Sequence, residues 1–224
     1  MKANFTITVL LFVALHPSFG QARWGIEFKG SRSNTTNNGQ LLGGSDGSIT
    51  YTIDNEDDLE TSSQSLGVIY KLDDRNLLKF HLGSHQNGRT LTLTACDDNG
   101  QCTTYSNVTV GFRYFQLAPS YCYRVLNKKF IIPVEAGINM NIQRKENDVI
   151  FIKINEFNLD YEISTGLDYR IDSTLMVGLH GIYSGNLNEY QDKEFVNGTY
   201  KPKQLGFEFS VLYEFGKNNE KNNQ

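Results

Sequence analysis

One run near the carboxyl end decides the fold of this chain: Gln204-Leu205-Gly206-Phe207-Glu208-Phe209-Ser210-Val211-Leu212-Tyr213-Glu214-Phe215. Every second side chain from Leu205 to Phe215 is apolar, and those between are small or acidic except Leu212. Because successive side chains of a strand point to opposite faces, one face of this strand suits hydrocarbon and the other suits water. A soluble sheet with its apolar face turned inward has the same pattern, so the rest of the chain must distinguish the two.

The composition excludes a helical membrane protein. Of the 224 residues, 39% are hydrophobic, the mean hydropathy is -0.41, and no segment after the amino terminus approaches the roughly 18 to 20 continuous apolar residues that a spanning helix needs. A membrane β-barrel stays open, because alternate residues of its strands face water and keep the average hydropathy low. The net charge of -4 gives no indication of a nucleic-acid partner.

The amino terminus has the features of a secretory signal peptide. A lysine near the start is followed by an apolar run from Ile7 to Leu15, and then by the small residues Ser18 and Gly20 at the expected -3 and -1 positions. We expect residues 1–20 to be removed, which leaves a mature chain that begins at Gln21. The alternative, a short transmembrane anchor, is disfavoured because the apolar run is too short to span a bilayer.

Seven other segments repeat the alternation of the closing run, so we predict eight strands. They are Arg23–Lys29, Gln64–Leu72, Leu77–Ser84, Val108–Val125, Phe130–Gln143, Asn158–Ile171, Thr174–Tyr183 and Gln204–Phe215. In the fourth, the apolar phase changes after Tyr114, which predicts a bulge between Tyr114 and Tyr121 with Pro119 as its cause. We expect the last strand to pair with the first, because a barrel without free edges satisfies every backbone group in a bilayer.

The connections between these strands alternate between long and short. In an up-and-down barrel every second connection lies at the same end, so the short turns gather at one rim and the long loops at the other. The apolar faces carry aromatic residues near the short-turn rim, as in an interfacial girdle: Trp24, Tyr70, Phe130, Tyr169, Tyr213 and Phe215. The sequence therefore predicts an all-β fold, an eight-stranded antiparallel up-and-down transmembrane β-barrel over residues 21–215.

The opposite faces of the strands carry charged side chains of both signs. Turned inward, they would form a polar lumen from Arg23, Glu27, Lys29, Lys71, Lys79, His81, Arg113, Glu135, Asp160, Glu162, Asp168, Arg170, His180, Glu208 and Glu214. Eight strands leave an interior that side chains fill. An unpaired buried charge costs several kcal/mol, so we predict nearly complete pairing and a closed lumen.

Two cysteines flank a polar turn between the third and fourth strands. If Asp98-Asn99-Gly100 forms a three-residue turn, Cys96 and Cys102 lie opposite each other in a hairpin. Such a pair forms a disulfide at low strain, and export to an oxidising compartment favours the bonded form. We expect Cys122 to be unpaired.

No catalytic, cofactor or metal site emerges from the sequence. The pairs Ser84–His85 and His180–Ser184 are the candidates for a lipid hydrolase, and neither forms a persuasive motif. Metal binding by His81 together with His180 would require both rings at one level of the lumen, and a place among other polar interior groups is the simpler interpretation. We expect a protein that is not an enzyme.

These features resemble the small eight-stranded outer-membrane β-barrels of Gram-negative bacteria, the OmpA-like and OmpX-like group. The resemblance covers Arg23 to Phe215, and its most specific motif is the terminal run that looks like the signal read by the barrel-insertion machinery: Phe209, Val211, Tyr213 and Phe215. The chain departs from that pattern by a hydrophilic tail, residues 216–224. These nine residues are too few for a peptidoglycan-binding domain, so no cell-wall anchoring is implied.

The resemblance implies an outer-membrane location, with both termini in the periplasm and the long loops outside the cell. The implied partners are outer-membrane lipid, the insertion machinery and an unknown extracellular ligand of the loops, and we expect a monomer. Function would then lie in surface binding, adhesion or envelope integrity. The alternatives are an enzyme that modifies outer-membrane lipid and a soluble, lipocalin-like periplasmic carrier.

Overall fold

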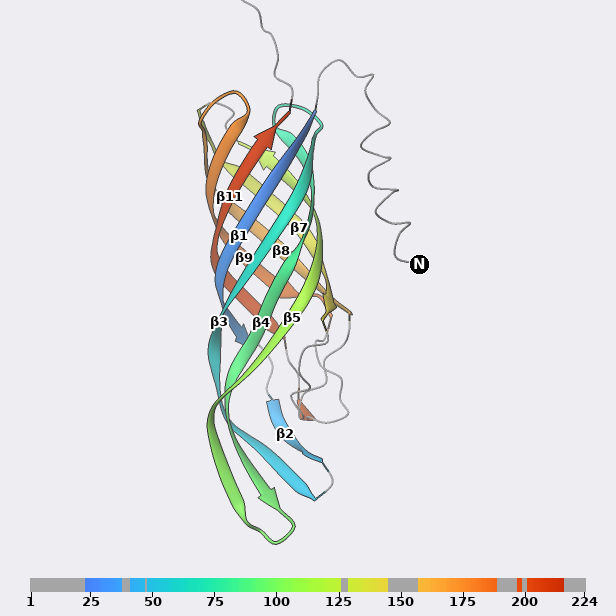
Figure 1. Ribbon diagram of the computed structural model, residues 1–224, viewed down its shortest axis with the longest axis vertical. Coiled ribbons are helices and arrows are strands. Elements are labelled where there is room, and N and C mark those ends of the chain that lie inside the picture. The colour runs from blue at the N-terminus through green and yellow to red at the C-terminus, as the bar shows by residue number, and fades with distance from the viewer. Residues whose placement is uncertain are drawn as a thin grey trace, which may run out of the picture.

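The chain closes into one antiparallel barrel that continues at one end into a long projection (Figure 1). The computed structural model describes residues 23–37, 41–46, 48–125, 129–144, 157–188, 197–198 and 201–215, and the predicted signal peptide and tail lie outside them. Among the described residues, no helix is long and apolar enough to cross a membrane.

Eight long strands form the barrel wall in the described part of the chain. They are β1 (Trp24–Asn37), β3 (Ile49–Lys71), β4 (Asn76–Asp97), β5 (Cys102–Arg124), β7 (Pro133–Gln143), β8 (Phe157–Arg170), β9 (Leu175–Asn186) and β11 (Pro202–Glu214). Three short strands accompany them: β2 (Leu41–Asp46), β6 (Phe130–Ile131) and β10 (Asn197–Gly198). Each wall strand pairs antiparallel with its chain neighbours, and β1 closes the circle with β11. The predicted fold is confirmed, as is the pairing of first and last strands.

The register fixes the tilt of the strands. Paired residues, followed once around the wall, lead from Trp24 through Tyr70, Leu78, Tyr121, Ala136, Ile163, Tyr183 and Leu205 to Asn34. The path returns to β1 at position 34 instead of 24, a stagger of ten residues. Such a stagger inclines the strands to the barrel axis, by about 35–45° in barrels of this kind.

The outer face of the wall is apolar and the inner face is polar. Phe207 and Leu205 are 71% and 68% exposed, whereas the inward-facing Glu27 and Lys79 are only 2% and 5% exposed. A soluble carrier would have the reverse arrangement, with apolar side chains inside. This wall suits hydrocarbon, because the closed ladder leaves its backbone no unpaired edge.

The short-turn rim of the wall has a defined structure. At the short-turn rim, aromatic rings of neighbouring strands pack in pairs, with centroid distances of 4.8 Å for Trp24–Tyr70 and 5.3 Å for Phe130–Tyr169. Just inside this rim, six buried side chains form an apolar layer: Ile69, Leu77, Cys122, Ile131, Met176 and Leu212. Leu212, the exception in the closing run, therefore faces this layer, and Cys122 is a free, buried thiol.

The predicted bulge near Pro119 is wrong. The register of β5 with β4 is unbroken from Tyr123 to Val108, and the shift lies farther out, opposite Leu91 and Leu93. Val110 is buried inside and Arg113 is exposed outside, so the strand keeps its phase while the polarity of its faces inverts. The alternate positions that carry apolar side chains change after Tyr114 because the outer face of a regular strand passes from lipid to water, not because the strand has a bulge.

The segment 30–63, which lies between the first two predicted strands and was therefore expected to be a long connection, is largely strand. β1 continues to Asn37 and β3 begins at Ile49. Beyond the wall, β3, β4 and β5 run on together with β2 as a projecting arm (Figure 1). We call residues 49–58, 89–97 and 102–110, with β2, the arm. Polar residues fit these strands because their outer face meets water there, not lipid.

Candidate functional site

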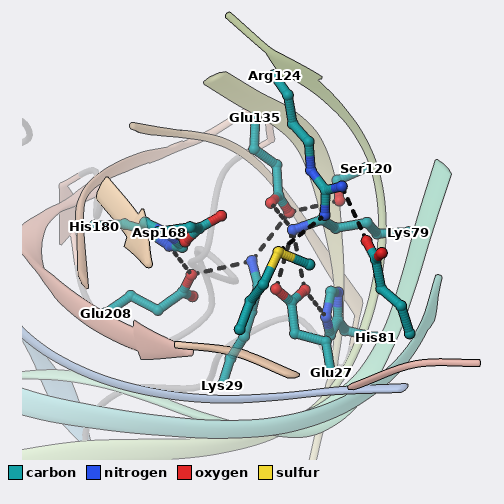
Figure 2. Close-up of polar contacts among 12 residues, drawn as sticks. Glu27, Lys29, Lys79, His81, Ser120, Arg124, Glu135, Asp168, His180 and Glu208 are labelled. Carbon is teal, nitrogen blue, oxygen red and sulfur yellow. Dashed lines mark hydrogen bonds and ion pairs between the residues drawn. The ribbon is translucent and has the colours of Figure 1, made fainter. Parts of the chain in front are cut away.

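A network of ion pairs crosses the middle of the lumen (Figure 2). The ammonium Nζ of Lys79 lies 3.0 Å from Glu27 Oε2 and 2.7 Å from Glu135 Oε2. The ammonium of Lys29 lies 3.0 Å from Glu135 Oε1 and 3.0 Å from Glu208 Oε1. These five residues come from β1, β4, β7 and β11, so their alternating ion pairs connect strands from different sides of the wall. We call this set, with the histidines below, the lumen network.

Two histidines extend the lumen network. His81 Nε2 lies 3.0 Å from Glu27 Oε2. His180 holds Asp168 at 2.7 Å through Nε2 and Glu208 at 3.3 Å through Nδ1. With a carboxylate on each ring nitrogen, His180 is fixed in orientation and keeps no free ring nitrogen to activate a serine.

A second ion cluster lies at the short-turn end. Arg124 is 1% exposed and its Nη1 lies 2.9 Å from Glu214 Oε1, while Lys71 pairs with the other carboxylate oxygen of Glu214. Arg124 Nη2 also lies 4.0 Å from the sulfur of Met176, which belongs to the apolar layer. The sequence reasoning missed Arg124, although the outward alternation of Tyr121 and Tyr123 places it inside.

A third group closes the lumen towards the arm. Arg89 donates to Asp58 Oδ1 at 2.7 Å and to the carbonyl oxygen of Thr35 at 3.1 Å. Gln204 donates to the Thr35 hydroxyl at 3.2 Å and to the carbonyl oxygen of Gln86 at 3.1 Å. Arg89 was also missed, because it lies where the outward side chains of β4 are already polar and the alternation is weak.

Little free space remains between these layers. A cavity of about 30 Å³ lies among Lys29, His81, Glu135 and Glu208 in the middle of the lumen. A water needs roughly 10–15 Å³ of such space, so the cavity holds about two waters. In the described chain, the middle of the lumen is therefore filled mainly by packed polar side chains.

The structure places the other predicted lumen residues as follows. Asp160 accepts a hydrogen bond from Asn141 at 2.6 Å, and Glu162 accepts one from Asn139 at 2.9 Å. Arg170 lies on the inner face of β8 and is half-buried.

Two predicted lumen residues lie elsewhere. Arg23 is exposed at the rim, where it donates to the carbonyl oxygen of Leu72 at 3.1 Å, because it precedes the first paired residue of β1. Arg113 points outward, because β5 keeps its phase as its outer face passes into water.

The pair Ser84–His85, considered for catalysis, does not assemble. Ser84 is exposed on the outer face while His85 is buried inside, so the two point to opposite sides of β4. In the described part of the chain, no three His, Cys, Asp or Glu side chains come together to hold a metal ion.

At the tip of the arm, Cys96 and Cys102 form a disulfide across the paired ends of β4 and β5. Within the turn, Asp97 Oδ1 accepts hydrogen bonds from the backbone N–H of Asn99 at 3.0 Å and of Gln101 at 2.8 Å. These hydrogen bonds hold the pKa of Asp97 below its ordinary value. Gly100 has a positive φ of 77°, which a glycine adopts at little cost. The tip is thus fixed by the disulfide and by the hydrogen bonds that Asp97 accepts within the turn.

The comparisons with known proteins agree with this geometry at the level of the fold. No family model matches the sequence, and no curated protein matches it. Among solved structures, the chain is similar to Neisserial surface protein A, with 12% identity over 88% of this chain and 100% of that chain and a TM-score of 0.54. The outer membrane protein AlkL follows, with 14% identity, 92% and 96% coverage and a TM-score of 0.48. At these identities the likeness shows the fold alone, which is that of the small eight-stranded outer-membrane β-barrels.

Proposed function

From this fold we propose that the protein is a non-conducting outer-membrane barrel whose task is to hold a binding arm outside the cell. The observation that carries the proposal is the arm itself. The ladder of β4 and β5 continues beyond the wall to the disulfide between Cys96 and Cys102. A barrel that only sealed the membrane would need no such extension.

The closed lumen supports the anchoring part of the proposal. Three layers fill the barrel in turn: the apolar layer, the lumen network, and the group around Arg89 and Gln204. Removing one partner of a buried ion pair costs about 3–5 kcal/mol, so ions would not displace these layers readily. We expect planar bilayers that contain the protein to show no stable conductance, and a large, lasting conductance would contradict this part.

The placement of the two rims supports the orientation that we propose. The short turns and the two chain ends of the wall, in β1 and β11, lie at one rim, and the arm lies at the other (Figure 1). In the orientation that we propose, the rim with the short turns faces the periplasm. The terminal residues Phe209, Tyr213 and Phe215 are exposed on the outer face, where the insertion machinery would read them.

The surface of the arm suits a macromolecular partner. Small molecules bind in concave pockets, whereas the arm is a projecting ribbon. Thr103, Thr104 and Tyr105 are all exposed near its tip, with Thr103 and Tyr105 on one face of β5 and Thr104 on the other, and Tyr105 is 50% exposed. Threonine hydroxyls and a tyrosine ring supply adaptable hydrogen bonds and contact area at low entropic cost, as they do in antibody loops.

The experiment that tests the function shortens the arm without opening the wall. Residues 92–107 are replaced by Asn-Gly, which joins the paired residues Leu91 and Val108 by a two-residue hairpin turn. Bacteria displaying either form are applied to a layer of cultured epithelial cells and to a glycan array, with equal surface amounts and heat-modifiable gel mobility as controls. We expect binding by the full chain and at least a tenfold loss in the shortened one. Equal binding by the two forms, or no binding by the full chain to either probe, would reject the proposal.

A further inference from the structure

The apolar belt around the barrel has unequal height. On β11, all outward side chains from Leu205 to Phe215 are apolar, which at about 3.3 Å per residue and a tilt near 40° makes a belt of roughly 25 Å. On β1, the outward apolar side chains run only from Trp24 to Phe28, which corresponds to roughly 10 Å of axial height. A bilayer that fits β11 therefore reaches well past Phe28.

Polar residues occupy the missing part of the belt. The outward positions there are Gly30 and Arg32 on β1, and Ser62 and Gln64 on β3, and we call these four residues the notch. Arg32 is paired in register with Phe207, so the polar surface lies beside the apolar surface of β11. The notch faces the half of the bilayer nearer the arm, because the wall strands run from the short-turn rim towards it.

The notch is also hollow. A groove of about 350 Å³ runs over Gly30, with Phe207, Phe209 and Leu179 along one side and Arg32 and Gln64 on the other. A Cβ atom added at Gly30 would meet no other atom within 4 Å, so the groove results from the missing side chain. One of its walls is apolar, with Phe207 71% and Leu179 60% exposed, and the other offers hydrogen-bond donors.

Arg32 is held in place and keeps donors to offer. Its side chain is 75% exposed. The Glu60 carboxylate pairs with its Nε and accepts a hydrogen bond from its Nη2 at 2.6 Å. A guanidinium has five N–H donors, so two go to Glu60 and three stay available within the described structure. The carboxylate thus fixes the orientation of the guanidinium while part of its donor set faces the groove.

We propose that the notch is a binding site for the phosphate-bearing head of an outer-leaflet glycolipid, lipopolysaccharide, one of whose acyl chains lies along Phe207 and Phe209. This inference rests on the orientation in the proposed function, which makes the arm side the outer leaflet. Phosphate oxygens accept hydrogen bonds from Arg32, as a guanidinium prefers. Sugar hydroxyls match the Gln64 amide, which otherwise faces a lipid environment. They also match the Ser62 hydroxyl, which lies 3.5 Å from Gln86 Oε1.

The test fills the groove and removes the charge separately. Gly30→Phe has room and no positive φ to prevent folding. We expect Arg32→Gln to leave the wall intact, because the Arg32 side chain is 75% exposed. Ala136→Phe, on the outer face of β7, is the matched control, because it adds the same ring to the lipid-facing wall far from the notch. Native mass spectrometry of each protein, extracted in mild detergent, counts the bound lipopolysaccharide. We expect about a tenfold loss of retention in the two notch variants, the size of a lost charged contact, and none in the control.

Two outcomes would overturn the proposal. One is equal retention by Gly30→Phe and Ala136→Phe. The other is equal, Gly30-dependent retention of phosphatidylglycerol from bicelles without lipopolysaccharide, which would show that any anionic lipid suffices. Protease sensitivity of the arm on intact cells reports the orientation, and cell binding reports the function of the arm. If the unaltered protein retains no lipopolysaccharide while its arm-dependent cell binding is intact, only the glycolipid site is rejected. If it retains lipopolysaccharide through Gly30 but shows no arm-dependent binding, only the function of the arm is rejected.

Discussion

The wall and the arm are built from the same strands with opposite polarity. On β4, the outward Leu78 and Phe80 lie opposite the buried Lys79 in the wall, whereas in the arm the outward Thr92 lies between the buried Leu91 and Leu93. The backbone and the pairing with β5 change little between the two regions. The surroundings decide the faces, because hydrocarbon surrounds one region and water the other. The interior is therefore dominated by ion pairs in the middle of the wall, whereas buried apolar side chains lie inside the arm.

The largest expected effect is the removal of one charge from the core of the wall. Glu135→Ala leaves Lys29 and Lys79 without their shared carboxylate, and we expect a loss of about 3–5 kcal/mol in the free energy of unfolding. Urea titration in lipid vesicles measures it. Glu60→Ala removes a carboxylate from the exposed pair with Arg32 and serves as control. Equal destabilisation by the two changes would mean that the lumen network does not hold the barrel.

We expect the stability of the arm to depend on apolar packing, so a substitution that leaves a cavity should destabilise it. Leu91 is 2% exposed, so Leu91→Ala should cost about 2–4 kcal/mol, confined to the arm. Hydrogen exchange should show faster exchange in the arm at unchanged protection of the wall. The outward Thr92→Ala is the matched control. Faster exchange throughout the wall would show that the arm and wall share one core.

The disulfide should have a smaller effect that is also local. The bond closes a short loop between Cys96 and Cys102, for which the loop-entropy estimate is about 2 kcal/mol. Replacing both residues by serine should loosen the arm tip in hydrogen exchange and leave heat-modifiable mobility unchanged. Mass spectrometry of unreduced digests is a direct check, and free thiols at both positions would contradict the bond.

The smallest expected effect comes from a turn at the short-turn rim. Asp172 accepts hydrogen bonds from the backbone N–H groups of Thr174 and Leu175, which lower its pKa below the ordinary 3.8. A lowered folded pKa stabilises the folded state above pH 3.8, and this contribution is lost as the pH falls through the folded pKa. Unfolding measured from pH 6 to pH 2 should therefore show a smaller acid loss in Asp172→Asn. An identical pH profile would show that these hydrogen bonds do not matter.

Most of the fold follows from the sequence because the side chains of a wall strand alternate with a period of two. Along the whole strand, one face meets lipid and the other meets the lumen. The run from Leu205 to Phe215 indicates its outer face directly, and local spacing brings Cys96 and Cys102 together. Prediction failed where the surroundings changed. Val110 and Arg113 were assigned faces as if lipid still lay outside, which gave a false bulge and a false lumen charge.

The partners within the lumen could not be predicted. Whether Lys29 meets Glu135 or Glu162 depends on the height of each residue along the barrel. That height follows from the stagger of ten residues, which is a property of the closed sheet. The local sequence of a strand shows that a residue points into the lumen. It does not show which residue of another strand it meets there.

One measurement tests most directly whether the wall lies in the membrane and the arm outside the cell. One cysteine is added in the arm by Asp57→Cys and, in a second variant, on the outer face of the wall by Leu78→Cys, with Cys122 replaced by serine in both. Intact cells are then exposed to a maleimide that does not cross membranes. The structure predicts labelling at position 57 and none at position 78, where lipid excludes the reagent. Labelling at position 78, or at position 57 only after the cells are opened, would contradict the account.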